Sequence, residues 1–145
     1  MRKMSLIAFF MLCISVIHAE EWVTDFNEAK QLAASEHKNI LMLFQGSDWC
    51  SVCMRLDKEI LSTDEFLKKA KEQYVLLKVD FPRRKANALP KEQQEKNNRL
   101  FEKYNQKGYF PLVVILDEKG DVLGETGYKK MSPDEYFNHL TALKQ

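Results

Sequence analysis

The chain has 145 residues, of which 45% are apolar and 30% are charged, so it is long enough and apolar enough to bury the core of one domain. Its 22 basic residues nearly balance 21 acidic ones, which argues against a nucleic-acid binder, because such proteins need a basic excess to replace the counterions of phosphates. Beyond the N-terminus no stretch is apolar and long enough to span a bilayer, so we expect no stable membrane insertion.

The first 19 residues have the layout of a secretory signal peptide. Arg2 and Lys3 give a positive start, residues 6–17 are almost wholly apolar, and the small residue Ala19 precedes two glutamates. We therefore predict a signal peptide over residues 1–19, cut after Ala19. A retained membrane anchor is the alternative, although the apolar run is short for a span.

Cleavage would leave a mature domain over residues 20–145 and would remove Cys13, so that Cys50 and Cys53 are the cysteines that remain. The bulky residues before Cys13 argue against lipid attachment at that cysteine. An export signal implies a compartment in which disulfides persist.

The elements of the first third of the mature domain follow from apolar periodicity. A short extended lead-in covers residues 20–24. Asp25 and Glu28 form a plausible capping box, and a helix should run from there to about His37. The continuous apolar run within residues 39–45 predicts a buried strand.

The next segment predicts a helix that starts close to Cys50 and continues through Leu61. Ser62 or Thr63 can cap one further turn. A second apolar strand is expected over residues 74–81.

The polar and basic residues 82–90 are expected to form a loop, followed by a helix over residues 91–106 that Gly108 is well placed to end. Strands are predicted over residues 112–116 and 122–126, and the turn between them makes them a hairpin.

The last helix begins with a capping Ser132, a proline at its first position and Glu135. Helices join the early strands, which favours parallel pairing, whereas the tight turn between the last two requires antiparallel pairing. The order therefore predicts an α/β fold with a mixed central sheet and helices on both faces.

Trp49, Cys50 and Cys53 carry the chemistry, because they follow a buried strand and open a helix. Unpaired N–H groups and the helix dipole at that terminus favour the thiolate of Cys50, so its pKa should be lowered. Cys53 lies about one turn deeper, within reach of a mixed disulfide on Cys50. We therefore predict that Cys50 attacks and Cys53 resolves.

Three other interpretations of the cysteine pair compete. A zinc site needs four ligands, and the mature chain offers only His37 and His139, which are far apart in sequence. An iron–sulfur site would need still more thiolates. A purely structural disulfide that closes so short a loop would add little stability. We expect no metal and no cofactor.

The mature chain resembles the thioredoxin superfamily over nearly its whole length. The resemblance rests on Trp49 and the CxxC pair after a strand, and on the single Pro111 ahead of a late strand. The family resemblance implies that the Phe110–Pro111 bond is cis and faces the cysteines. It also implies that Trp49, Phe110 and Pro111 contact bound substrate, with a core aromatic as the alternative for Phe110.

The sequence 46–50, with Met54, Leu56 and Asp57, is similar to the secreted thioredoxin-like Dsb oxidoreductases, above all the DsbH group and more distantly the C-terminal domain of DsbD. These likenesses imply a periplasmic location, protein thiols and disulfides as substrates, and a DsbD-like membrane protein as electron donor. A monomer is expected, because the chain has no room for a dimerisation domain.

Two features depart from the thioredoxin pattern. Thioredoxins keep a buried aspartate on the strand before the motif, where this chain has Leu43 and Phe44. Asp57 could replace it as the acceptor of the Cys53 proton, since it lies four residues further along the helix, with a solvated surface carboxylate as the alternative. The polar stretch 82–98 could be a partner-specific surface or a solvated insertion, and its composition favours the second.

The residues between the cysteines bear on the direction of the reaction. Ser51 and Val52 supply no cation or imidazole beside Cys50, and Asp48 and Asp57 disfavour a strongly stabilised thiolate. We therefore expect a disulfide reductase that keeps exported protein thiols reduced. An isomerase, an oxidase and a non-catalytic peptide-binding or chaperone module are the alternatives.

Overall fold

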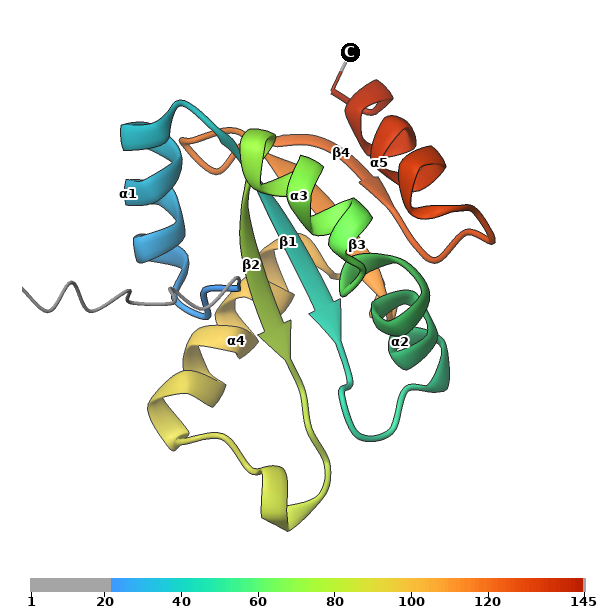
Figure 1. Ribbon diagram of the computed structural model, residues 1–145. Helices are drawn as coiled ribbons and strands as arrows, with labels where there is room; N and C mark the ends of the chain where they lie inside the picture. The colour runs from blue at the N-terminus through green and yellow to red at the C-terminus, as the bar shows by residue number, and fades with distance from the viewer. Residues whose placement is uncertain (1–21, 145) are drawn as a thin grey trace, which may run out of the picture.

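A mixed sheet of four strands, in the order β2-β1-β3-β4, forms the centre of the fold (Figure 1). The computed structural model describes residues 22–144, so the predicted signal peptide over 1–19 lies outside the described residues. The elements are α1 (Phe26–Glu36), β1 (Asn39–Gln45), α2 (Ser51–Leu56), η1 (Asp57–Leu61), α3 (Asp64–Gln73), β2 (Tyr74–Asp80), η2 (Lys85–Asn87), α4 (Lys91–Tyr104), β3 (Leu112–Leu116), β4 (Val122–Thr126) and α5 (Pro133–Ala142).

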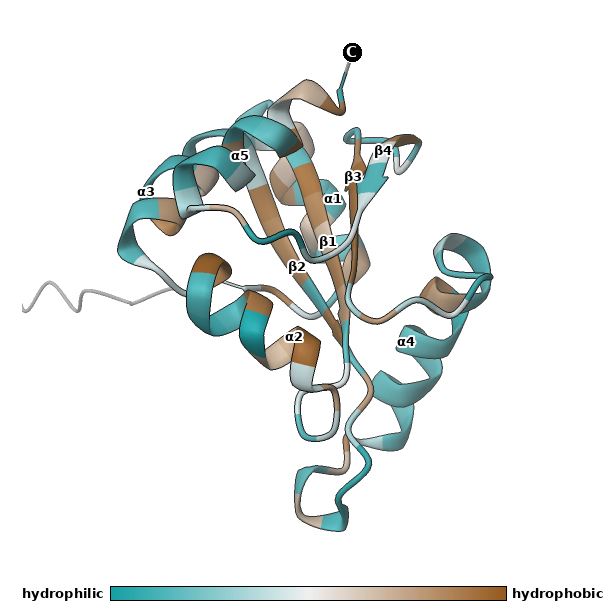
Figure 2. Ribbon diagram, turned by 90° about the vertical axis from the view of Figure 1, so that its right-hand side faces the viewer, coloured by the Kyte–Doolittle hydropathy of each residue, from teal (hydrophilic) through white to brown (hydrophobic). Residues whose placement is uncertain are grey.

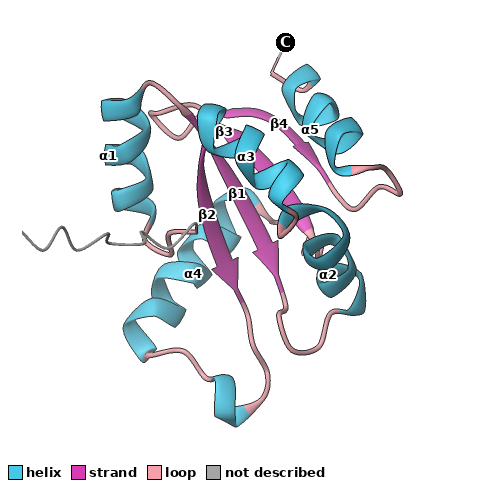
Figure 3. Ribbon diagram, in the orientation of Figure 1, coloured by secondary structure: helices cyan, strands magenta, loops and turns pink. Residues whose placement is uncertain are grey.

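The strand pairing confirms the predicted mixed sheet (Figure 3). β1 runs parallel to β2, whereas β3 pairs antiparallel with both β1 and β4. Gln45 lies opposite Asp80, and Phe44 lies opposite Leu112. The carboxyl ends of β1 and β2 therefore meet the start of β3 at one edge of the sheet, and the loops at this edge carry the candidate site.

The two faces of the sheet are buried under different helices (Figure 2). Because strand side chains alternate between faces, Leu41 and Leu43 join the cluster with residues of α2, α3 and α5, while Ile40, Met42 and Phe44 join the cluster with residues of α1 and α4. The predicted arrangement of helices on both faces is thereby confirmed.

Three predicted helix starts have the expected capping residues. Asp25 accepts hydrogen bonds from the backbone N–H groups of Asn27 and Glu28 ahead of α1. Ser132 and Glu135 form a complete capping box at α5. Thr63 accepts from the N–H of Phe66 at the start of α3.

The predicted helix from Cys50 to Leu61 differs from expectation in its second half. The α-helical part ends at Leu56, and a π turn, η1, continues to Leu61. The N–H of Ser62 donates to the carbonyl of Asp57 at 2.8 Å, which is the wider ring of a π turn. The wide turn allows Leu56, Ile60 and Leu61 all to be fully buried.

Two other helices differ in length from the prediction. α3 has 10 residues rather than one turn, because Phe66, Leu67 and Ala70 bury a full helical face. α4 ends at Tyr104, two residues before the predicted end, and Gly108 lies in the following turn at φ 70°. Within residues 22–144 no helix has both the length and the apolar character that crossing a membrane requires.

Candidate redox site

Cys50 and Cys53 form a disulfide at the start of α2, with their Cα atoms 5.2 Å apart. Cys50 is the N-cap of the helix, and its Sγ accepts the N–H of Cys53 at 3.2 Å. Cys50 is 7% exposed and Cys53 only 3%, so Cys50 is the more accessible of the two. The pair therefore lies where the sequence placed it, with a backbone donor directed at the outer sulfur.

Trp49 is fixed against the loop that precedes the cysteines. Its indole N–H donates to the carbonyl of Phe81 at 2.7 Å, which ties the loop to the end of β2. A Cβ on Gly46 would come within 2.2 Å of the Trp49 ring, so a side chain at that position would displace the ring. Glycine at 46 is thus required by the close approach of the indole.

The Phe110–Pro111 peptide bond is cis, as the family resemblance implied. Pro111 directly precedes β3, whose first residue Leu112 pairs with Phe44 near the end of β1. The Phe110 ring packs edge-on against Trp49, with centroids 5.4 Å apart. The structure therefore brings Trp49, Phe110 and Pro111 to the same edge of the sheet as the cysteines.

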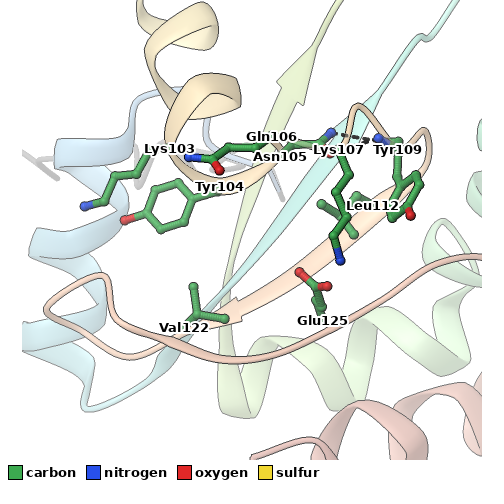
Figure 4. A pocket seen from close by; sticks show the side chains of 9 residues that line it. All are labelled: Lys103, Tyr104, Asn105, Gln106, Lys107, Tyr109, Leu112, Val122 and Glu125. Atoms are coloured by element: carbon green, nitrogen blue, oxygen red, sulfur yellow. Dashed lines mark hydrogen bonds between the residues drawn. The ribbon is translucent and has the colours of Figure 1, made fainter.

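Asn105 holds the turn that leads into the cis proline. Its buried side chain donates to the carbonyl of Tyr109 at 2.8 Å and accepts the Tyr109 N–H at 2.9 Å. Figure 4 shows this pair of residues at the rim of a hollow of about 270 Å³ between the end of α4 and β4. Neither cysteine lines the hollow, and Asn105 in its lining fixes the turn before the proline.

Asp48 connects the motif to the loop after β2. Its carboxylate accepts the backbone N–H groups of Arg83 and Arg84, each at 2.9 Å, and the side-chain amide of Asn87 at 3.0 Å. The hydrogen bond from the Arg83 N–H, followed by that from Asn87, lowers the pKa of Asp48 below its ordinary value. Residues 83–88 are exposed, yet three of them are bonded to the redox loop through Asp48, and within the predicted polar stretch 82–98 the side chain of Asn97 is buried in α4.

Replacing Asp48 with alanine is expected to release the loop after β2. Because three donors lose their acceptor, the amide hydrogens of Arg83 and Arg84 should exchange about tenfold faster. Asp117→Ala is the matched control, since Asp117 accepts the N–H groups of Lys119 and Asp121 in a remote turn. Unchanged exchange at Arg83 and Arg84 in Asp48→Ala would contradict the assignment.

The same contact should depend on pH in a defined direction. The pKa of Asp48 is lowered in the folded protein, so its stabilising effect is present above the pKa of an unfolded aspartate and is lost as the pH falls through the folded-state value. Protection of the two arginine amides should therefore decline only in acid.

Asp57 lies at the first position of the π turn and is half-buried. Its carboxylate accepts the hydroxyl of Ser62 at 2.8 Å, and its backbone N–H donates to the carbonyls of Cys53 and Met54. The structure thus places Asp57 one turn after Cys53, with Ser62 as the hydrogen-bond partner of its carboxylate. Leu43 and Phe44, where thioredoxins are expected to keep an aspartate, are both in the core.

Two contacts of the site were not predicted from the sequence. One is the set of hydrogen bonds from Arg83, Arg84 and Asn87 to the Asp48 carboxylate. The other is the guanidinium of Arg83, which lies 3.8 Å from the centroid of the Trp49 ring. The expected parallel pairing of β1 and β2 could have indicated both contacts. Residues that follow two neighbouring parallel strands lie at the same end of the sheet, as Asp48 and Arg83 do. Within residues 22–144 no group of three or more His, Cys, Asp or Glu side chains is placed to hold a metal ion.

Comparisons with known proteins agree with this geometry. A family model described as thioredoxin-like matches residues 21–118. The disulfide bond reductase DsbH of Chlamydia pneumoniae is 36% identical over 120 residues, which cover 82% of this chain and 70% of that protein.

Solved structures extend the likeness. A DsbH oxidoreductase has a TM-score of 0.78 and 31% identity, covering 85% of this chain and 83% of that structure. The oxidised C-terminal domain of DsbD from Neisseria meningitidis has a TM-score of 0.53 and 18% identity, covering 83% of this chain and 97% of that domain. At that identity the second likeness shows the fold alone.

Proposed function

The chain belongs to the thioredoxin-like family and is a thiol–disulfide oxidoreductase related to DsbH, and from this premise we propose that it reduces disulfides of exported proteins. The observation that carries the proposal is the Cys50–Cys53 disulfide at the start of α2. The relative DsbH is a disulfide bond reductase, which supports the reducing direction.

The reaction consists of two exchanges of sulfur partners. The thiolate of Cys50 attacks one sulfur of a substrate disulfide, forms a mixed disulfide and releases the other substrate sulfur as a thiolate. Cys53 then loses its proton and attacks the Sγ of Cys50, which releases the second substrate thiol. The substrate gains two electrons and the protein ends with the Cys50–Cys53 disulfide that the structure contains.

The groups around the cysteines have separate roles in this scheme. The N–H of Cys53, which donates to the Sγ of Cys50, faces the thiolate when the pair is reduced and stabilises its charge. Trp49, Phe110 and Pro111 bind the substrate chain beside its disulfide. The backbone N–H and carbonyl of Phe110 pair with the extended substrate.

We propose that Asp57, one helical turn after Cys53, accepts the proton of Cys53 as the mixed disulfide is resolved. Asp57→Asn should slow this second step at least about tenfold and leave the first attack unchanged. Stopped-flow single turnovers with a fluorescent disulfide peptide separate the two steps. Asp64→Asn, on the exposed first turn of α3, is the matched control, and equal resolution rates in wild type and Asp57→Asn would contradict the role.

Reduction of insulin by the mature chain, with dithiothreitol as the electron source, tests the direction. We expect precipitation of the insulin B chain to be accelerated well above the rate with dithiothreitol alone. The contrary result is no acceleration, together with efficient oxidation of a reduced, unfolded test protein, which would favour an oxidase.

The signal-like residues 1–19 lead us to propose that the protein works in the periplasm. We further propose that it acts as a monomer. A DsbD-like membrane protein would then return two electrons to the cysteine pair after each turnover. Mass spectrometry of the protein from a periplasmic extract should find a chain that begins at Glu20. A cytoplasmic protein that retains residues 1–19 would contradict the location.

A further inference from the structure

Four aromatic side chains line a groove of about 360 Å³ that begins at the residue before Cys50. They come from separate parts of the chain: Trp49, Phe81, Phe101 and Phe110. Phe101 and Phe110 stack with centroids 5.9 Å apart, and Phe81 packs edge-on against both. Because each ring supports the next, the apolar floor of the groove is formed before any substrate binds.

One cation lies on the wall of this groove. The guanidinium of Arg83 lies 3.8 Å from the centroid of the Trp49 ring, and the Arg83 backbone N–H donates to the Asp48 carboxylate. The side chain is exposed, and among the described residues no carboxylate forms an ion pair with it. Its planar donors are therefore oriented by the indole and available to a ligand.

The segment that follows β2 and borders the groove is basic. Residues 82–91 contain no acidic residue and four basic ones, namely Arg83, Arg84, Lys85 and Lys91. The nearest acids of α4 have lysine partners: Glu92 lies 3.0 Å from Lys96, and Glu95 lies 3.9 Å from Lys91. Asp48 is occupied by three donors of the loop itself.

We propose that this groove selects substrates in which an apolar residue and a carboxylate flank the reacting cysteine. The proposal rests on the proposed reductase function and names its substrate class. The apolar side chain packs on Phe81, Phe101 and Phe110, and the carboxylate binds the guanidinium of Arg83. Arginine suits this task because its fork of donors can hold both carboxylate oxygens.

Reduction of matched peptides tests the selection. Each peptide carries one cysteine in a mixed disulfide with a neutral reporter thiol, a phenylalanine beside it, and Glu, Gln or Lys at the next position. We expect wild-type kcat/KM to be about fivefold higher for the Glu peptide than for the Lys peptide, and this preference to shrink as salt is added. Arg83→Gln should abolish the preference, and Arg83→Glu should reverse it.

Arg99→Glu is the matched control, because Arg99 is an exposed arginine of α4 that lines a different hollow, beside Asp25 and Phe26. This variant should keep the wild-type preference. Equal wild-type rates on the three peptides, or a Glu preference that survives in Arg83→Glu, would overturn the selection while the reductase function stands. Failure to reduce any peptide, or the neutral disulfide of mercaptoethanol, would overturn the reductase function and the selection with it.

Discussion

Replacing Cys50 with serine is expected to lower the catalysed rate of disulfide reduction at least about a thousandfold, to the uncatalysed level. A serine hydroxyl is not ionised near neutral pH and cannot form the mixed disulfide on which the reaction depends. The fold should be unaffected, since a disulfide that closes a loop of three residues constrains little of the unfolded chain.

Cys53→Ser is the informative partner of this variant, because it removes only the second step. It should attack substrate at a rate similar to wild type and then accumulate a mixed disulfide on Cys50, visible by mass spectrometry without reductant. Loss of the adduct in the double variant Cys50→Ser, Cys53→Ser is the control. Accumulation of the adduct on Cys53 in Cys50→Ser, with no adduct on Cys50 in Cys53→Ser, would reverse the assigned roles.

Phe66→Ala is expected to lower the free energy of unfolding by about 3–5 kcal/mol. Phe66 on α3 is fully buried, and its ring lies 6.4 Å from the rings of both Tyr136 and Phe137 on α5. Alanine would leave a cavity between these helices and would remove two aromatic contacts.

Phe66→Leu is the matched control for this cavity, because leucine retains most of the apolar volume and should cost under about 1.5 kcal/mol. Urea unfolding of the mature chain gives both values by linear extrapolation. A loss below about 1 kcal/mol in Phe66→Ala would contradict the packing between α3 and α5. The packing of Phe66 also supports the redox site, because Leu56 of α2 and Ile60 of η1 belong to the same buried cluster as Phe66.

The inner strands of the sheet could be predicted closely because β1, β2 and β3 are largely buried on both faces. Continuous apolar runs give the bounds of β1 and β3 directly, and the turn before Asp121 marks the hairpin to β4. The position of the cysteine pair could be predicted in the same way, because a CxxC that lies between a buried strand and a helix is expected at the N-terminus of that helix. The cis state of Pro111 came from the family resemblance, because nothing local distinguishes it from a trans proline.

The π turn and the contacts of Arg83 could not be predicted from local sequence. Residues 57–61 have an ordinary helical pattern, and the wide turn arises from packing Ile60 and Leu61 against the sheet together. Arg83 reaches Trp49 only because β1 and β2 end side by side, which is a property of the register and not of either segment alone.

The reduction potential of the Cys50–Cys53 pair tests the proposed direction most directly. No imidazole or cation follows Cys50 in the motif, and the donor to its Sγ is one backbone N–H, so we expect a potential near thioredoxin's value of about −270 mV. Equilibration of the mature chain with glutathione and dithiothreitol buffers, followed by thiol alkylation and mass spectrometry, measures it. A value near about −120 mV, that of the oxidant DsbA, would mean that the protein delivers disulfides and would contradict the reductase proposal.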